Sequence, residues 1–125
     1  MAHLLFRPTF EIPFSEGALR ILLEALIDIN LMSIRAQAYP LLYESGVYYQ
    51  AEEPGFERFL SIPSVIDQGY GDCEDLACWR IAELRHLGQY AVPYLILTRT
   101  DDRLRYHIAV ALSNNVIEDP SDRLS

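Results

Sequence analysis

Residues 69–88 read GYGDCEDLACWRIAELRHLG, a glycine-rich loop followed by a helical pattern around which the other predicted elements are arranged. Asp72 is a natural N-cap, and the acidic residues just after it suit the positive end of a helix dipole. Gly88 is a typical residue just beyond a helix C-terminus. A helix is therefore predicted over residues 73–87.

Three strands are predicted after this helix. Residues 91–100 are rich in β-branched and aromatic side chains, and residues 104–112 form a similar run after an Asp-Asp turn. Asn114-Asn115 predicts a hairpin turn, which leads into a short third strand over residues 116–118. Strands joined by short turns pair antiparallel, so this part of the chain is predicted to form a meander.

A longer helix is predicted upstream, over residues 16–35, with Ser15 as its N-cap. Arg20, Glu24 and Asp28 recur every four residues as a narrow polar stripe, and apolar side chains cover the rest of the circumference. This pattern predicts a core helix that is buried on several sides. The alternative is a helix that docks on a partner chain.

The segment between the two helices, residues 39–60, is rich in aromatic and turn-forming residues. Its aromatic side chains either wall a groove or pack a small core with their hydroxyls in water. They are Tyr43, Tyr48, Tyr49, Phe56 and Phe59. A short turn or helix is predicted to start at Ile62. Helices followed by an antiparallel meander place the chain in the α+β class.

The composition limits the possible functions. The chain has 125 residues, of which 50% are hydrophobic, which is typical of one globular domain. Eighteen acidic residues against ten basic ones give a formal net charge of −8, so no nucleic-acid partner is expected. All ten basic residues are arginine, which excludes a Schiff-base or phosphate-loop lysine. Neither a signal peptide nor a membrane span is predicted.

The two cysteines lie on the same predicted helix. Cys73 and Cys78 are five residues apart, where helical geometry carries their side chains too far from each other for a disulfide. A reduced, cytoplasmic protein is therefore expected. A zinc set joining them to His86 and His107 fits no common ligand spacing, so we expect no metal and no other cofactor. Cys78 is expected in the core, and His86 as a cation at the helix C-terminus.

Cys73, His107 and Asp119 occupy positions that nucleophilic catalysis can use. A helix N-terminus stabilises a thiolate, and its free N–H groups can also bind an oxyanion. An imidazole can exchange a proton with the thiol, and a carboxylate can orient that imidazole. The predicted hairpin brings His107 and Asp119 side by side. The simpler alternative is a small buried cysteine and a packed strand histidine.

The acidic flank of Cys73 argues against easy activation of its thiol. Asp72, Glu74 and Asp75 carry negative charges that disfavour a neighbouring thiolate. Either a histidine outweighs them, or they point away from the sulfur or pair with arginines. Asp75 is expected to have a structural role, either capping the loop or holding Arg80.

The loop sequence GYGDCEDLA at residues 69–77, the strand histidine His107 and the ending EDPS at residues 118–121 resemble the transglutaminase-like (papain-like) cysteine peptidase superfamily. The similarity is greatest to short members encoded by bacteriophages, prophages and gene-transfer agents. It covers about residues 40–121, behind an N-terminal helical segment at residues 1–38. The resemblance implies one domain over the whole chain, with a papain-like core in which the cysteine-bearing helix packs on a small antiparallel sheet.

The resemblance also implies roles for single residues. Cys73 would be the nucleophile, His107 the base and acid, and Asp119 the group that orients the histidine. Gln68 would be the oxyanion donor, although a loop glutamine facing water is an equal alternative. The residues that would support the loop and the helix cap are Gly71, Asp72 and Asp75.

Two functions of different classes follow from these residues. The first is a cysteine-dependent acyl-transfer enzyme with a peptide or protein substrate, acting by hydrolysis or by transfer to an amine. The second is a structural or assembly protein of a phage particle, bound to other phage structural proteins, with little or no catalysis. A third interpretation is a peptide-binding module without turnover. The phage resemblance implies a location in the host cytoplasm or the virion.

Overall fold

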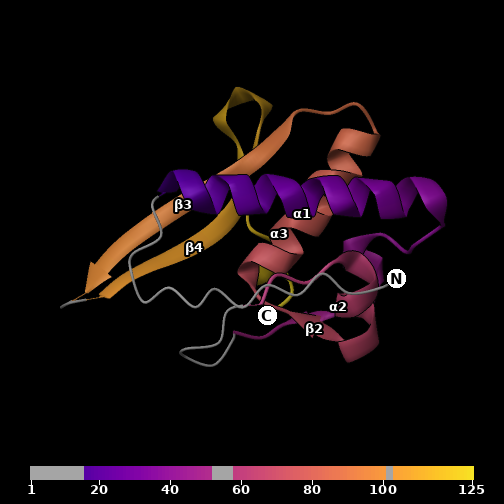
Figure 1. Cartoon of the computed structure of the whole chain (residues 1–125), viewed down its shortest axis with the longest axis horizontal. Helices are drawn as coiled ribbons and strands as arrows, with labels where there is room; N and C mark the ends of the chain where they lie inside the picture. Colours follow the sequence, from indigo (N-terminus) through magenta and orange to yellow (C-terminus); the bar gives the residue numbers. More distant parts are fainter. Residues whose placement is uncertain (1–15, 52–57, 101–102) are drawn as a thin grey trace.

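The structure, a computed structural model, describes residues 16–51, 58–100 and 103–125. Within these ranges the chain forms four α-helices and two small sheets, which confirms the predicted α+β class (Figure 1). None of the helices in this part of the chain has the length and apolar character needed to cross a bilayer. Ser15 and Phe56, for which roles are predicted from the sequence, lie outside the described residues.

The helix α3 (Cys73–His86) is the central element of the fold. It contacts the long helix α1 (Glu16–Ala36) and both long strands, β3 (Ala91–Thr100) and β4 (Arg103–Leu112) (Figure 1). Most of its residues are buried, from the first turn to the last. Because its polar residues share this buried surface with small and apolar ones, α3 needs hydrogen-bond partners for them inside the fold.

The start of α3 is fixed by a capping box. The Asp72 carboxylate accepts hydrogen bonds from the first turn of the helix, including one of 2.6 Å from the Cys73 backbone N–H. Asp75 is fully buried and accepts a 3.1 Å hydrogen bond from the Asp72 N–H and a 2.7 Å bond from the Leu60 N–H. A Cβ atom on Gly71 would lie only 3.2 Å from Asp75 Cβ, so a glycine suits this close approach. These contacts agree with the structural role expected for Asp75.

The main sheet is an antiparallel meander in the order β3-β4-β5, where β5 is Ile117–Glu118. This order and the positions of the strands agree with the sequence prediction. The turn between β4 and β5 has φ values of 65° at Asn114 and 61° at Asn115. Asparagine tolerates this left-handed conformation better than most residues, which explains why the Asn-Asn pair predicts the turn correctly.

A second sheet consists of two parallel strands that the sequence analysis does not predict, β1 (Tyr48–Tyr49) and β2 (Tyr70–Gly71). Each strand has two residues, which is too short for a recognisable alternation of apolar and polar side chains. The pairing sets Tyr49 opposite Gly71, directly before the start of α3. The aromatic segment therefore lies beside the loop that carries Cys73.

The helix α1 is buried along one face only, which corrects the prediction of burial on several sides. Its buried positions are Leu19, Leu23, Leu26, Ile27 and Asn30. On its other side Ile21 is 72% exposed and Met32 is 69% exposed. The physical reason is that α1 is an outer layer of the fold, covered from the side of α3 (Figure 1). Docking of this outer side on a partner chain stays a prediction.

Two polar contacts attach α1 to the rest of the fold. Arg85 at the end of α3 forms a bidentate ion pair with Glu24, with N–O distances of 2.8 and 3.0 Å. This hydrogen bonding lowers the pKa of the Glu24 carboxyl. Asn30 accepts a 3.0 Å hydrogen bond from the Ile62 N–H at the start of α2 (Ile62–Gln68). The polar stripe of α1 thus contributes one of its residues, Glu24, to the packing of the two long helices.

The core has two parts that meet at α3. The first lies between α1, α3 and the main sheet and includes Phe59, Cys73 and Cys78. The second includes Leu76 and Trp79 of α3, together with residues of α2 and the short 3₁₀ helix η1 (Leu42–Glu44). Of the predicted aromatic residues, Phe59 is fully buried and Tyr48 is 50% exposed. The aromatic segment therefore contributes Phe59 to the core and exposes Tyr48 to solvent.

Replacement of Asp75 tests the dependence of the fold on the capping box. Asp75→Ala leaves one buried and one partly buried backbone N–H group without their acceptor, so we expect a loss of about 3 kcal/mol in the free energy of unfolding. Urea denaturation followed by circular dichroism measures the change. Asp67→Ala, at an exposed site on α2, is the control and should change stability by less than about 0.5 kcal/mol. Equal stability of the two variants would contradict this role of Asp75.

Candidate active site

Cys73 is the first residue of α3 and lies against β4. Its side chain is 6% exposed, and it belongs to the core between α1, α3 and the main sheet. The backbone of Ile108 in β4 provides a hydrogen bond at the sulfur. The thiol itself donates a hydrogen bond to Glu74 Oε2 at 3.2 Å. The sulfur is thus held between the Glu74 side chain and the backbone of Ile108, the residue after His107.

The surroundings of Cys73 keep its thiol protonated. Burial is the largest cause that raises the pKa of this thiol far above its ordinary value, and the charges of Glu74 and Asp72 raise it further. The hydrogen bond from the Ile108 backbone lowers the pKa but is outweighed. The sequence-based expectation that the acidic flank disfavours a thiolate therefore agrees with these contacts. A thiolate at the sulfur is not the resting state of this site at neutral pH.

His107 and Asp119 form a bonded pair at the middle of the main sheet. The distance between His107 Nε2 and Asp119 Oδ2 is 2.8 Å, and each side chain is about one-third exposed. The other carboxylate oxygen of Asp119 accepts a 3.1 Å hydrogen bond from the Ser121 N–H and caps the short helix α4 (Pro120–Arg123). The carboxylate is therefore held at both oxygens, and its orientation toward the imidazole is fixed.

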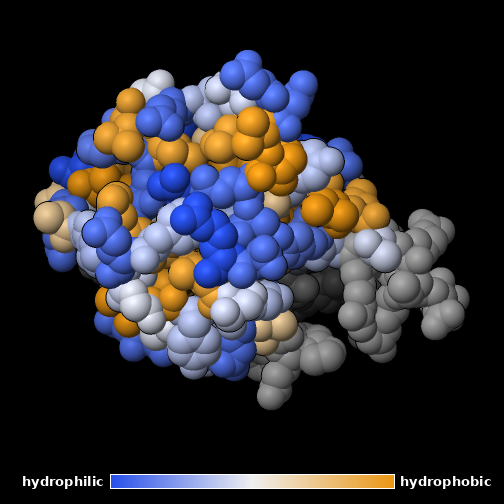
Figure 2. Space-filling view, turned by 180° about the vertical axis from the view of Figure 1, so that it is seen from behind, coloured by the Kyte–Doolittle hydropathy of each residue, from blue (hydrophilic) through white to orange (hydrophobic). Residues whose placement is uncertain are grey.

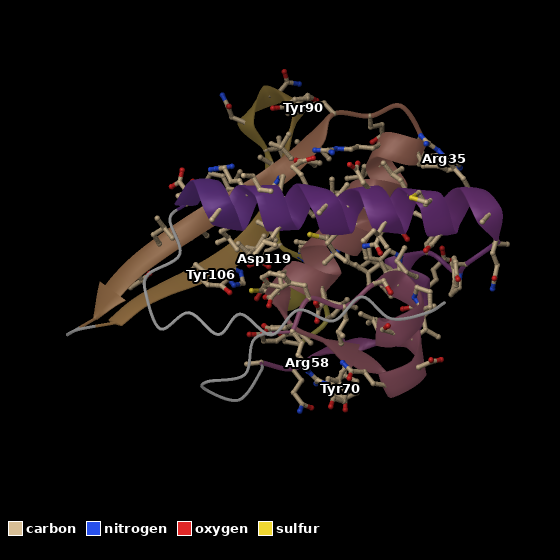
Figure 3. All side chains as sticks on the ribbon, viewed as in Figure 1. Arg35, Arg58, Tyr70, Tyr90, Tyr106 and Asp119 are labelled. Atoms are coloured by element: carbon tan, nitrogen blue, oxygen red, sulfur yellow. The ribbon has the colours of Figure 1, made fainter. Side chains whose placement is uncertain are left out.

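The three residues of the predicted triad are brought together in two parts. His107 bonds Asp119 directly, whereas Cys73 faces the backbone of Ile108, the neighbour of His107 in β4. Among the described residues, the thiol hydrogen bond goes to Glu74 and none joins Cys73 to His107. In this view Asp119 lies between β4 and the first turn of α3 (Figure 3), two elements that contact each other.

Tyr49 is an aromatic side chain that lies beside the loop carrying Cys73. It packs against the core that contains Cys73, and its strand partner is Gly71, two residues before the cysteine. Burial raises the pKa of its phenol, and so do the negative charges of the surrounding acidic groups. The carboxylates among these groups are Asp72, Glu74 and Asp119. The sequence indicates Tyr49 as a possible groove wall but gives no sign of its position beside the cysteine loop.

Gln68, the predicted oxyanion donor, uses its amide elsewhere. Its Nε2 donates a 2.7 Å hydrogen bond to the carbonyl of Tyr70, within the loop itself. This bond shapes the loop that precedes α3, because it spans the left-handed Gly69. The donor that the structure does place at the sulfur is the Ile108 backbone.

Among the described residues, no hydrogen bond joins Cys78 or His86 to Cys73, His107 or Asp119. Cys78 is fully buried in the core, with its thiol 3.6 Å from the carbonyl oxygen of Leu23, and both cysteines are free. His86 is exposed in the last turn of α3.

Within the described residues, the side chains that could share a metal ion are Asp72, Cys73 and Glu74, whose ligand atoms lie within 4.8 Å of one another. This grouping differs from the zinc set considered from the sequence.

Comparisons with protein-family models, with curated proteins and with solved structures found no match for this chain. The function is therefore inferred from the residues and their geometry.

The pH dependence of Cys73 alkylation tests the electrostatics of the site. Because the pKa of the thiol is raised, its thiolate fraction should increase about tenfold for each pH unit between about 6 and 9. The rate of iodoacetamide labelling at Cys73, measured by peptide mass spectrometry to separate it from Cys78, should follow that slope. A rate that stays flat across this range would contradict a protonated resting thiol.

Replacement of Glu74 tests which group raises the pKa of the Cys73 thiol. Glu74→Gln removes the nearest negative charge from the sulfur, so it should lower the pKa of the thiol and speed labelling of Cys73 at a given pH. Glu44→Gln removes an exposed charge in η1 and serves as the control. Equal labelling rates in the two variants would show that Glu74 does not set the reactivity of Cys73.

Proposed function

We propose that this chain is a cysteine-dependent acyl-transfer enzyme with a papain-like core and a Cys73–His107–Asp119 triad. The observation that carries the proposal is the 2.8 Å bond between His107 and Asp119. His107 is next to Ile108 in β4, and the backbone of Ile108 faces the Cys73 sulfur. Support also comes from the packing of the cysteine-bearing helix α3 against the strand that bears the histidine. That arrangement agrees with the resemblance to the transglutaminase-like superfamily.

The bond to Asp119 defines what the imidazole can do. When His107 Nε2 carries the proton that it shares with the carboxylate, the lone pair of Nδ1 is available as a base. Among the described residues, no hydrogen bond occupies Nδ1. The carboxylate also stabilises the imidazolium that forms after proton transfer. His107 is therefore suited to accept a proton at Nδ1 and return it later.

The protonated thiol favours general-base activation over a stored thiolate–imidazolium pair. The thiol turns from Glu74 toward His107, and Nδ1 takes its proton as the sulfur attacks an amide carbonyl carbon. The C=O π electrons move to the oxygen. The tetrahedral intermediate then breaks its C–N bond, and the imidazolium gives its proton to the leaving amine. A thioester on Cys73 remains.

The second half of the reaction decides the product. Water, deprotonated by the same imidazole, attacks the thioester and releases a carboxylic acid and the free thiol. The substrate class is a peptide or protein amide, and hydrolysis is the default outcome. Transfer to an amine would need an acceptor from another molecule, because the chain contains no lysine.

The alternative function is a structural or assembly protein of a phage particle that keeps this fold with little or no catalysis. A specific observation favours it, which is the burial of Cys73 and the strongly raised pKa of its thiol. Its partners would be other phage structural proteins, whereas the enzyme requires a peptide or protein substrate. In either case the expected location is the host cytoplasm or the virion.

Acylation by an activated ester tests the enzyme proposal. We expect p-nitrophenyl acetate to place an acetyl group on Cys73 as a thioester, detectable by intact mass and removed by hydroxylamine. His107→Gln should slow this acylation about 100-fold, because the general base is lost. His86→Gln makes the same substitution at an exposed site on α3 and should leave the rate unchanged.

Two outcomes would contradict the enzyme proposal. One is an acylation rate in His107→Gln equal to that of the unmodified chain. The other is an acetyl group found on Cys78 instead of Cys73. Full biological function of a Cys73→Ser variant, with the protein at a fixed stoichiometry in a particle, would favour the assembly role.

A further inference from the structure

The position of Asp119 depends on a very short strand. The strand β5 has two residues, which pair with β4 through Val110↔Glu118 and Ala111↔Ile117. Asp119 follows directly and ends the strand. So short a ladder supplies few backbone hydrogen bonds, and side-chain contacts must contribute to holding the catalytic carboxylate in place.

The side chain of Glu118 is fixed from two other elements. Its Oε2 accepts a 2.5 Å hydrogen bond from the Tyr43 hydroxyl of η1 and a 2.6 Å bond from Arg80 Nε of α3. Arg80 also reaches the second carboxylate oxygen at 3.5 Å. The Arg80 and Glu118 side chains are only 20% and 13% exposed, so water screens this pair less than a surface ion pair.

The lowered pKa of the Glu118 carboxyl agrees with its close contacts to Arg80 and Tyr43. Burial alone would raise the pKa of Glu118, but the hydrogen bonds from Arg80 and Tyr43 outweigh it and lower the pKa. Arg123 of α4 lies over the Tyr43 ring, with 4.0 Å between its guanidinium carbon and the ring centroid. The helix α4 that Asp119 caps is therefore attached to the same tyrosine.

Arg80 is also connected to the core, through the buried side chain of Glu83. Arg80 Nη1 lies 3.3 Å from Glu83 Oε1. The other oxygen of Glu83 accepts hydrogen bonds of 2.9 Å from Trp79 Nε1 and 2.7 Å from the Leu42 N–H. The segment that carries Tyr43 and the helix that carries Arg80 are thus bonded to each other through one buried carboxylate.

We propose that Tyr43, Arg80 and Glu118, called here the Glu118 clamp, are positioning residues that hold Asp119 in the orientation that bonds His107. The clamp anchors the residue before Asp119, and the Arg123–Tyr43 contact anchors the helix after it. Without the clamp, β5 is free to shift along β4 and the His107–Asp119 bond loses its fixed geometry. The catalytic meaning of the clamp rests on the proposed function, whereas its effect on the imidazole does not.

The tautomer of His107 provides a readout that needs no catalysis. In the intact chain at pH 8, ¹⁵N NMR of labelled histidine should show one dominant tautomer with the proton on Nε2, because Asp119 accepts it. Glu118→Ala should shift the ¹⁵N signals toward a mixture of both tautomers. Tyr43→Phe, which removes one hydroxyl, should give a smaller shift in the same direction and is available if Glu118→Ala does not fold.

Controls separate positioning from a general loss of structure. Glu44→Ala removes an exposed glutamate beside Tyr43 and should leave the His107 signals unchanged. Asp119→Ala removes the acceptor itself and gives the full shift. Unchanged His107 signals in folded Glu118→Ala or Tyr43→Phe would overturn the proposal.

The acylation assay then distinguishes the two proposals. If both hold, Glu118→Ala shifts the tautomer and slows acylation of Cys73 about tenfold or more. A tautomer shift in a chain that never acylates Cys73 supports the clamp and counts against the enzyme. Acylation that depends on His107 but not on Glu118, with no tautomer shift, supports the enzyme and overturns the clamp.

Discussion

The buried start of α3 is the constraint on which the rest of the structure depends. The first N–H groups of a helix need acceptors, and at this helix water is largely excluded. Asp72 and Asp75 supply those acceptors, and Asp75 also binds the Leu60 N–H. The loop, the helix and the segment before α2 are thereby joined at one point. The Asp72 carboxylate, together with that of Glu74, also puts negative charge beside the sulfur of Cys73.

The burial of Cys73 and this negative charge together keep its thiol protonated and limit the chemistry available to the site. A helix N-terminus ordinarily favours a thiolate, but here its positive potential is used by the capping carboxylates. Catalysis at Cys73 therefore requires a base that acts during the reaction, and the His107–Asp119 pair fits this requirement.

The face of the molecule turned away from α1 shows apolar groups interspersed with polar ones (Figure 2). Ile96 of β3, which pairs with His107 of β4, is among the exposed apolar residues.

Local signals account for what the sequence predicts correctly. The N-cap Asp72 and the Asn114-Asn115 turn act over a few residues, so α3 and the β4–β5 hairpin are recognisable without knowledge of the fold. The hairpin also brings His107 and Asp119 together as predicted. The Tyr43–Glu118 contact joins residues 75 positions apart, which no local pattern reveals. The exposure of Ile21 depends on which neighbours cover α1, a tertiary property that helical periodicity does not contain.

The meander also has a consequence for association between molecules. In the described part of the chain β3 has a single strand neighbour, β4, so no strand pairs with the backbone groups along its other edge. Many proteins protect such an edge with lysine, which this chain lacks. Pro93, in the first half of β3, is the residue that can serve instead, since proline on an edge strand removes an N–H that an incoming strand would need. The protection against intermolecular strand pairing is thus concentrated at the end of β3 nearest α3.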